Sequence, residues 1–175
     1  MRTSNSGFIV PEGVEHPWKP ATEQEVREVE SKLGMPLPDD YRGFLKTVNG
    51  VWAVSPMLEI PMKTRNGEDD EPWVVGKLYS ISKDAEEHDF LLSHQQAYQF
   101  DQRVPKRFII IGGTFGTDQI CMSLAEPDRG KVFYWVPSGE GNEEPWEENT
   151  TKYLWPAASS FREFWSKLRV AKDDE

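Results

Sequence analysis

Cysteine and histidine are scarce in this sequence of 175 residues, which contains one cysteine and three histidines. The single cysteine, Cys121, leaves no intrachain disulfide possible and gives no sign of an oxidising compartment. So few thiols and imidazoles, scattered along the chain, are also insufficient for a structural zinc site. We therefore expect no metal and no cofactor, and a domain stabilised by its hydrophobic core alone.

Long apolar runs and an excess of basic residues are lacking as well. The longest aliphatic run, Phe108–Ile111, is far shorter than the ~20 residues of a transmembrane helix, and no apolar segment follows Arg2 as in a signal peptide. We expect a cytoplasmic protein that does not bind membranes. The 20 basic and 30 acidic residues give a net charge of −10, which argues against direct nucleic-acid binding because phosphate requires a basic face. It permits a protein partner with a basic surface.

The length favours one domain. Residues 1–21 have no regular pattern and are expected to form an N-terminal arm. Residues 22–170 are expected to form a single domain, and residues 171–175 a frayed tail. Nothing in the sequence specifies a symmetric patch, so it is compatible with a monomer or a homodimer.

Two short helices are expected to open the domain. Thr22 and Glu25 form a capping box at the start of the first helix, and Gly34 stands where a left-handed glycine ends a helix. Apolar residues at helical spacing predict the second helix over Asp39–Val48, and Asn49-Gly50 is a suitable left-handed stop.

Strands are expected in the middle of the chain. Segments rich in β-branched and aromatic residues lie within 51–60, 73–81, 107–111, 119–124 and 131–136. A helix is expected over 84–100, and a last helix begins near Ser160, which forms a second capping box with Glu163. Helices near both ends and strands between them predict the α+β class, with a central, mostly antiparallel sheet and flanking helices.

Four segments, in this order, carry the pattern of a known family. They are the helical stretch with Leu33, Gly34, Leu37, Pro38, Tyr41, Phe44, Leu45, Asn49 and Gly50; a glycine-rich turn with Gly112, Gly113, Gly116 and Asp118; the strand Gly130–Trp135; and the closing Ser160, Phe161 and Phe164. Together they span Thr22 to Leu168, and the sequence resembles the SMI1/KNR4 family of the SUKH superfamily. It departs from that pattern in its longer arm, in an acidic insertion over Pro61–Trp73 and at Thr117.

The resemblance implies an α+β domain that binds a protein and is not an enzyme. Many bacterial members are immunity proteins that neutralise a cognate toxin by stoichiometric binding, which is the function we expect. Fungal members are linked to cell-wall synthesis and signalling, so a regulatory adaptor or scaffold without a toxin partner is the alternative.

No catalytic set is recognisable among the residues themselves. The turn Gly112–Asp118 lacks the lysine of a phosphate-binding loop, and we expect its glycines to adopt positive φ while Asp118 accepts backbone hydrogen bonds. His88 and His94 do not align on one helix face, and Cys121, within an expected strand, is better explained as a buried apolar side chain. Without a nucleophile, a base and an orienting group, an enzyme is disfavoured.

Two acidic loops that each contain a tryptophan are the candidate binding sites. Both follow the order glycine, acidic residues, then Glu-Pro-Trp. Tryptophan is a favoured interface anchor, and carboxylates around it attract a basic partner. The candidate residues are Glu68, Asp69, Asp70, Glu71 and Trp73 in the first loop, and Glu143, Glu144, Trp146, Glu147 and Glu148 in the second. The alternative is that the tryptophans close the core and the acids keep the loops in solution.

Overall fold

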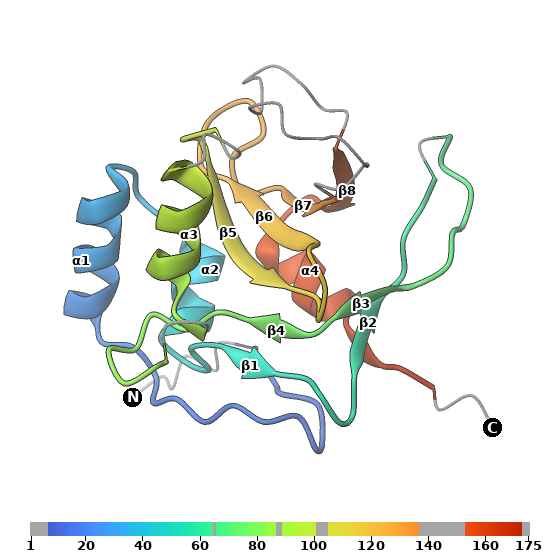
Figure 1. Ribbon diagram of the computed structural model, residues 1–175, viewed down its shortest axis with the longest axis horizontal. Coiled ribbons are helices and arrows are strands. Elements are labelled where there is room, and N and C mark those ends of the chain that lie inside the picture. Colours follow the sequence, from blue (N-terminus) through green and yellow to red (C-terminus); the bar gives the residue numbers. More distant parts are fainter. Residues whose placement is uncertain (1–6, 65, 87–88, 101–104, 137–152, 173–175) are drawn as a thin grey trace.

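The computed structural model describes residues 7–64, 66–86, 89–100, 105–136 and 153–172 (Figure 1). Its elements, in chain order, are α1 (Glu23–Leu33), α2 (Asp39–Leu45), β1 (Val51–Trp52), β2 (Leu58–Ile60), β3 (Trp73–Val75), β4 (Lys77–Leu78), α3 (Leu91–Phe100), β5 (Phe108–Gly113), β6 (Gln119–Ser123), β7 (Val132–Trp135), β8 (Leu154–Ala158), α4 (Phe161–Lys167) and β9 (Arg169–Val170). The predicted α+β class is confirmed.

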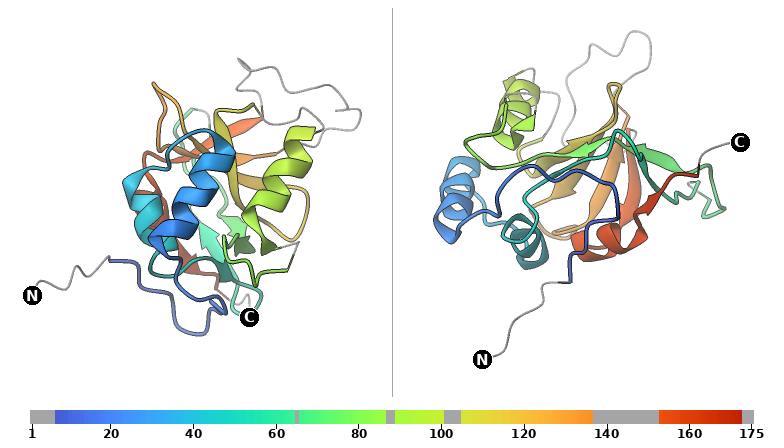
Figure 2. Two further views of the ribbon diagram at one scale, coloured as in Figure 1. Left: turned by 90° about the vertical axis from the view of Figure 1, so that its left-hand side faces the viewer. Right: turned by 90° about the horizontal axis from the view of Figure 1, so that it is seen from below.

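The strands form two antiparallel sheets. The larger sheet has six strands in the order β1-β4-β5-β6-β7-β8, and the smaller has three in the order β3-β2-β9. Figures 1 and 2 place α1, α2 and α3 on one side of strands β5 to β7, while β2 and β3 lie on the other side. The polypeptide enters the small sheet directly after β1, so the two sheets are joined at that end of the molecule.

The first two helices begin where the sequence predicts. The Thr22 hydroxyl accepts from the Glu25 N–H at 3.2 Å, and the Glu25 carboxylate accepts from the Thr22 N–H at 2.8 Å, which completes the capping box. Gly34 ends α1 with a φ of 72°. Helix α2 ends at Leu45, three residues before the predicted Val48, and the chain then turns while the N–H groups of Thr47, Val48 and Asn49 donate to the Phe44 carbonyl.

The third helix is shorter than predicted, because pairing with another part of the chain holds its first residues. The Ser80 N–H donates to the Asp89 carbonyl at 2.9 Å, and the Leu91 N–H donates to the Ser80 carbonyl at 2.8 Å. Residues just before Leu91 therefore run alongside Ser80 and Phe90 bridges to it, so α3 starts at Leu91 and not at Asp84.

A buried glutamine of α3 completes the edge of the larger sheet. Strand β4 has two residues and leaves the first half of β5 without a neighbour on that side. The Gln95 amide donates to the Phe108 carbonyl at 2.9 Å and accepts from the Ile110 N–H at 2.8 Å. One side chain thus substitutes for a missing strand and satisfies two backbone groups that burial would otherwise leave unpaired.

Two strands were not expected from the sequence. Strand β8 contains Pro156, which has no N–H to donate, and proline in a sheet is confined to edge strands and bulges. β8 is such an edge strand, paired with β7 alone. Strand β9 has two residues and forms only because Val170 and Arg169 lie opposite β2.

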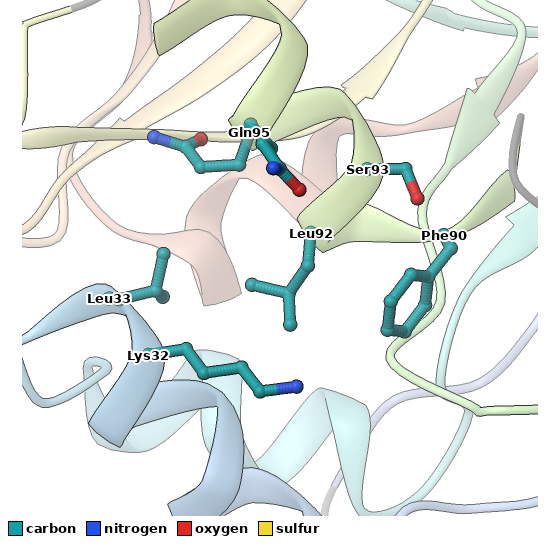
Figure 3. A pocket seen from close by; sticks show the side chains of 7 residues that line it. Lys32, Leu33, Phe90, Leu92, Ser93 and Gln95 are labelled. Carbon is teal, nitrogen blue, oxygen red and sulfur yellow. The ribbon is translucent and has the colours of Figure 1, made fainter. Parts of the chain in front are cut away.

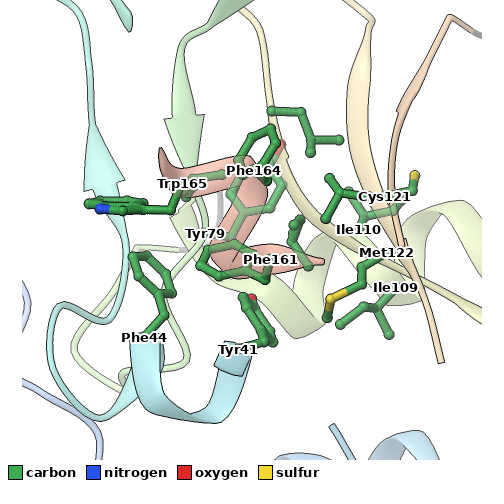
Figure 4. Packing of buried hydrophobic residues seen from close by; sticks show 14 of the residues in the cluster. Tyr41, Phe44, Tyr79, Ile109, Ile110, Cys121, Met122, Phe161, Phe164 and Trp165 are labelled. Atoms are coloured by element: carbon green, nitrogen blue, oxygen red, sulfur yellow. The ribbon is translucent and has the colours of Figure 1, made fainter. Parts of the chain in front are cut away.

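Aromatic rings from α2 and α4 meet in the core (Figure 4). Phe161 lies with its ring centroid 4.8 Å from Phe44 and 4.9 Å from Tyr41, and Trp165 lies 5.1 Å from Phe44. Phe8, which precedes the first helix by 15 residues, adds its ring 5.8 Å from Phe44 and is itself buried. Aromatic pairs at such distances stabilise a core by ~1 kcal/mol beyond their buried area.

The buried side chain of Asn49 connects three segments. Its backbone has a φ of 60°, which reverses the chain after α2. Its amide donates to the Lys19 carbonyl of the arm at 2.8 Å, and its carbonyl oxygen accepts from the Ile81 N–H at 3.1 Å, after β4. The next residue, Gly50, is crowded by the Leu78 carbonyl 2.9 Å from where a Cβ would stand, so strands β1 and β4 approach closely there.

We predict that Asn49→Ala lowers the free energy of unfolding by about 3 kcal/mol, because it removes two buried hydrogen bonds and leaves a Cβ at positive φ without compensation. Asn49→Gly tolerates the same φ and loses only the hydrogen bonds, so its loss should be smaller, about 2 kcal/mol. Urea unfolding of both variants measures the difference. A change below about 0.5 kcal/mol in both variants would show that the hydrogen bonds of the Asn49 side chain do not stabilise the fold.

Two surface glutamates are held ionised by lysine and arginine partners. The hydrogen bond from Lys46, together with Arg42, lowers the pKa of Glu23 to about 2, and Arg42 also bridges to Glu30 of α1. The hydrogen bonds from Lys167 and Ser159 lower the pKa of Glu163 to about 2. These contacts tie α2 to α1 and fix the first turn of α4.

A lowered native pKa contributes stability that is fully present above the unfolded value of 4.5 and is lost as pH falls through about 2. We therefore predict that the double variant Glu23→Gln/Glu163→Gln is less stable than the parent at pH 7, and that this gap closes between pH 4.5 and 2. Urea unfolding at several pH values measures it. Glu12→Gln, at an exposed glutamate without an ion pair among the described residues, is the control, and a gap independent of pH would contradict the prediction.

Candidate functional site

The first acidic loop is the outer part of a hairpin that continues β2 and β3. The Thr64 N–H donates to the Glu68 carbonyl at 2.8 Å, and the Asp70 N–H donates to the Met62 carbonyl at 3.1 Å. Gly67 closes the turn with a φ of 85°. In Figure 1 this hairpin projects from the small sheet, away from α1.

Four consecutive carboxylates, Glu68–Glu71, are exposed on this hairpin. The Asp69 carboxylate pairs with the Lys63 ammonium at 3.2 Å, and both side chains are well exposed. Those of Glu68, Asp70 and Glu71 form no ion pair with any described residue. The described part of the hairpin therefore carries an excess of uncompensated negative charge.

Trp73, the tryptophan of this loop, is only partly exposed. Its ring meets Tyr134 of β7 at 4.5 Å between centroids and Trp155 of β8 at 5.6 Å. The Tyr134 hydroxyl donates to the Val74 carbonyl at 2.7 Å, which ties β3 to the larger sheet. Trp73 thus seals the small sheet onto the large one, and the exposed charges on the described part of the hairpin are its four carboxylates and the Lys63 ammonium.

The second acidic loop lies outside the described residues. This holds for its five candidate residues, Glu143, Glu144, Trp146, Glu147 and Glu148. Their proposed contact with a partner stays a prediction.

The glycine-rich turn differs from the expectation. Gly112, Gly113 and Gly116 do not have positive φ. Gly112 is required for another reason: a Cβ there would stand 2.4 Å from the Lys77 carbonyl, so only glycine allows β4 to approach β5. The backbone carbonyl of Asp118 accepts from the Thr114 N–H at 3.1 Å, and burial raises the pKa of its carboxyl group. A desolvated acid in this turn disfavours phosphate.

The histidines and the cysteine do not converge. His94 is half-buried and stacks on Tyr79 at 3.9 Å between ring centroids, His16 is exposed on the arm, and His88 lies outside the described residues. Cys121 is buried in β6, and burial raises the pKa of its thiol, which keeps it protonated and unreactive. Within the described ranges, no three histidine, cysteine, aspartate or glutamate side chains are grouped so that they could hold a metal.

A groove runs between α1 and α3 (Figure 3). Its larger part has a volume of about 590 Å³ and is lined by Lys32, Leu33, Phe90, Leu92, Ser93, Gln95 and Gln96. Among the described residues, this part offers one ammonium, two amides and a hydroxyl beside apolar side chains, with neither a carboxylate nor an imidazole. The adjoining smaller part adds Glu25, Glu28 and Lys83. The described lining of the larger part lacks a pair that could act as general acid and base.

Among the described helices, none has the length and apolar character needed to cross a bilayer.

Comparison with known proteins identifies the fold family. The chain is 27% identical over 128 residues to the SPbeta prophage-derived uncharacterized protein YokK of Bacillus subtilis (strain 168), a match covering 65% of this chain and 61% of that protein. The chain thus matches about three fifths of this relative's length. The model of the SMI1 / KNR4 family (SUKH-1) matches residues 20–167. This match includes both helices of the opening motif, both sheets except β9, and the closing α4, so the chain belongs to the SMI1/KNR4 (SUKH-1) family.

Proposed function

We propose that this chain is an immunity protein of the cytoplasm that neutralises a toxin by binding it stoichiometrically, without catalysis. The observation that carries the proposal is its membership of the SUKH-1 family across residues 20–167. Because a fold family hosts more than one role, the proposal also depends on what the surface offers a partner.

The surface offers negative charge. The chain carries a net charge of −10, and three carboxylates of the projecting hairpin are free of ion pairs within the described structure. Such a field raises the rate at which a basic partner associates and repels acidic competitors. A toxin domain with a basic surface fits this chemistry.

The first test is co-expression of the chain with the product of the adjacent gene. We expect a one-to-one complex by size-exclusion chromatography with light scattering, and loss of the toxicity that the neighbour causes alone. A harmless neighbour that does not bind would contradict the proposal and would favour an adaptor or scaffold without a toxin partner.

A further prediction concerns the carboxylates of the hairpin. The triple variant Glu68→Gln/Asp70→Asn/Glu71→Gln should slow association with the toxin by about threefold to tenfold at low salt, because steering depends on the local field. It should also flatten the salt dependence of the association rate. Stopped-flow kinetics at several salt concentrations measure both effects.

The matched control is Glu12→Gln/Asp84→Asn/Glu126→Gln, which removes three exposed acids elsewhere and gives the same net charge. If both triple variants slow association equally, net charge alone acts and the hairpin is not part of the binding surface.

A further inference from the structure

A hollow beside β1 combines an exposed tryptophan with an unpaired carboxylate. It has a volume of about 310 Å³ and is lined by Glu15, Trp52, Val54 and Ser55; we call it the Trp52 hollow. This volume is at the lower end of the range for ligand pockets, so the hollow suits one side chain of a partner better than a whole cofactor.

Backbone pairing fixes the two principal walls of the hollow. The Trp52 N–H donates to the Glu15 carbonyl at 2.8 Å, and the Glu15 N–H donates to the Trp52 carbonyl at 3.3 Å. Residues that exchange both hydrogen bonds in an antiparallel pair lie directly opposite, with Cβ atoms ~5 Å apart on the same face. The carboxylate of Glu15 and the indole of Trp52 are therefore immediate neighbours.

The apolar side chains here are unusually exposed. Trp52 is 37% exposed, Val54 50% and Met57 43%, and Val54 and Met57 face each other across a tight turn. Alternation along β1 and the two residues after it explains this exposure, because Val51 and Ala53 are buried in the core while Trp52 and Val54 lie outside. Clustered exposed apolar side chains that include tryptophan are typical of protein-binding sites.

The charges at the hollow select a cation. The Glu15 carboxylate is exposed and pairs with no cation among the described residues. The indole of Trp52 already has the Lys77 ammonium 6.0 Å from its ring centroid, and Lys77 is neutralised by Asp89 at 3.1 Å. An electron-rich ring beside a free carboxylate is the arrangement that holds a guanidinium, which stacks on the ring and donates to the oxygens.

We infer that the Trp52 hollow binds an arginine side chain presented by the protein partner. The inference deepens the proposed function, on which it depends for the partner's identity. Trp52 supplies the stacking surface, Glu15 the charge-assisted hydrogen bonds, and Val54 the contact for the aliphatic part of the side chain.

A small probe tests the hollow without any toxin. The full chain, labelled with ¹⁵N, is titrated with N-acetyl-arginine amide and, separately, with N-acetyl-citrulline amide, which has the same shape without the charge. We expect a saturable shift of the Trp52 indole N–H signal, assigned by its absence in Trp52→Phe, with at least tenfold weaker binding of the citrulline compound.

Variants separate the role of charge from that of shape. Glu15→Gln should weaken binding of the arginine probe about tenfold, while Glu126→Gln, at an exposed acid elsewhere, should change it less than twofold. Equal responses to the two probes, or no shift at Trp52, would overturn the inference.

The second part of the test uses the complex with the toxin. Trp52→Ala should speed dissociation at least tenfold with little change in association, and Ile9→Ala, which truncates another exposed apolar side chain, should change neither. A complex that forms normally and is insensitive to Trp52→Ala would overturn the assignment of the hollow to the interface. If no complex forms with the wild-type chain, the proposed function fails, and the probe titration still decides on the hollow by itself.

Discussion

The buried amide of Asn49 is the contact on which the rest of this fold depends. It lies where α2 ends and β1 begins, and it bonds both the arm, at Lys19, and the chain beyond β4, at Ile81. The arm in turn pairs with β1 through Glu15, and β1 pairs with β4. One side chain therefore helps to position both walls of the Trp52 hollow through the backbone segments that it joins, together with the hydrogen bond from the Ala21 N–H to the Leu45 carbonyl. Asn49, a residue of the family motif, thus affects the Trp52 hollow only through the backbone segments that it holds in position.

The motif residues and the candidate binding residues occupy different parts of the molecule. Leu37, Tyr41, Phe44 and Phe161 are buried and define the packing of α2 against α4. The acids of the hairpin and the side chains of the Trp52 hollow lie outside the motif and are exposed. The pattern that identifies the family therefore specifies a scaffold, and in the proposed function the partner is selected by residues that the pattern does not include.

Local signals in the sequence predicted local structure well. The capping box at Thr22, the left-handed Gly34 and the apolar strands β5 to β7, which are buried along their whole length, depend on neighbours within a few residues. The start of α3, the edge strand β8 and the role of Gln95 depend on pairing with other segments of the chain, and no local pattern contains that information. At Gly112 the sequence predicts glycine because of a positive φ, whereas the structure requires it for the close approach of β4 to β5, and both constraints demand the same residue.

The same limit applies to the candidate site. The sequence reveals that the hairpin is acidic, because four consecutive carboxylates are bound to be exposed. It does not reveal which tryptophan is exposed. Alternation along a strand does not show which face meets the core until the neighbouring strand is known. Trp73 packs against Tyr134, while Trp52 remains partly outside.

The two surfaces differ in the physics that they bring to binding. The hairpin carboxylates stand in water, where ion pairs contribute little to affinity, about 0–1 kcal/mol each, although their field reaches a Debye length and steers encounter. The Trp52 hollow is partly enclosed, so a guanidinium bound there leaves water and gains from a ring and a carboxylate together. In the proposed complex, steering therefore belongs to the hairpin and retention to the hollow, and a partner that lacks a suitably placed arginine would still be attracted but would soon dissociate.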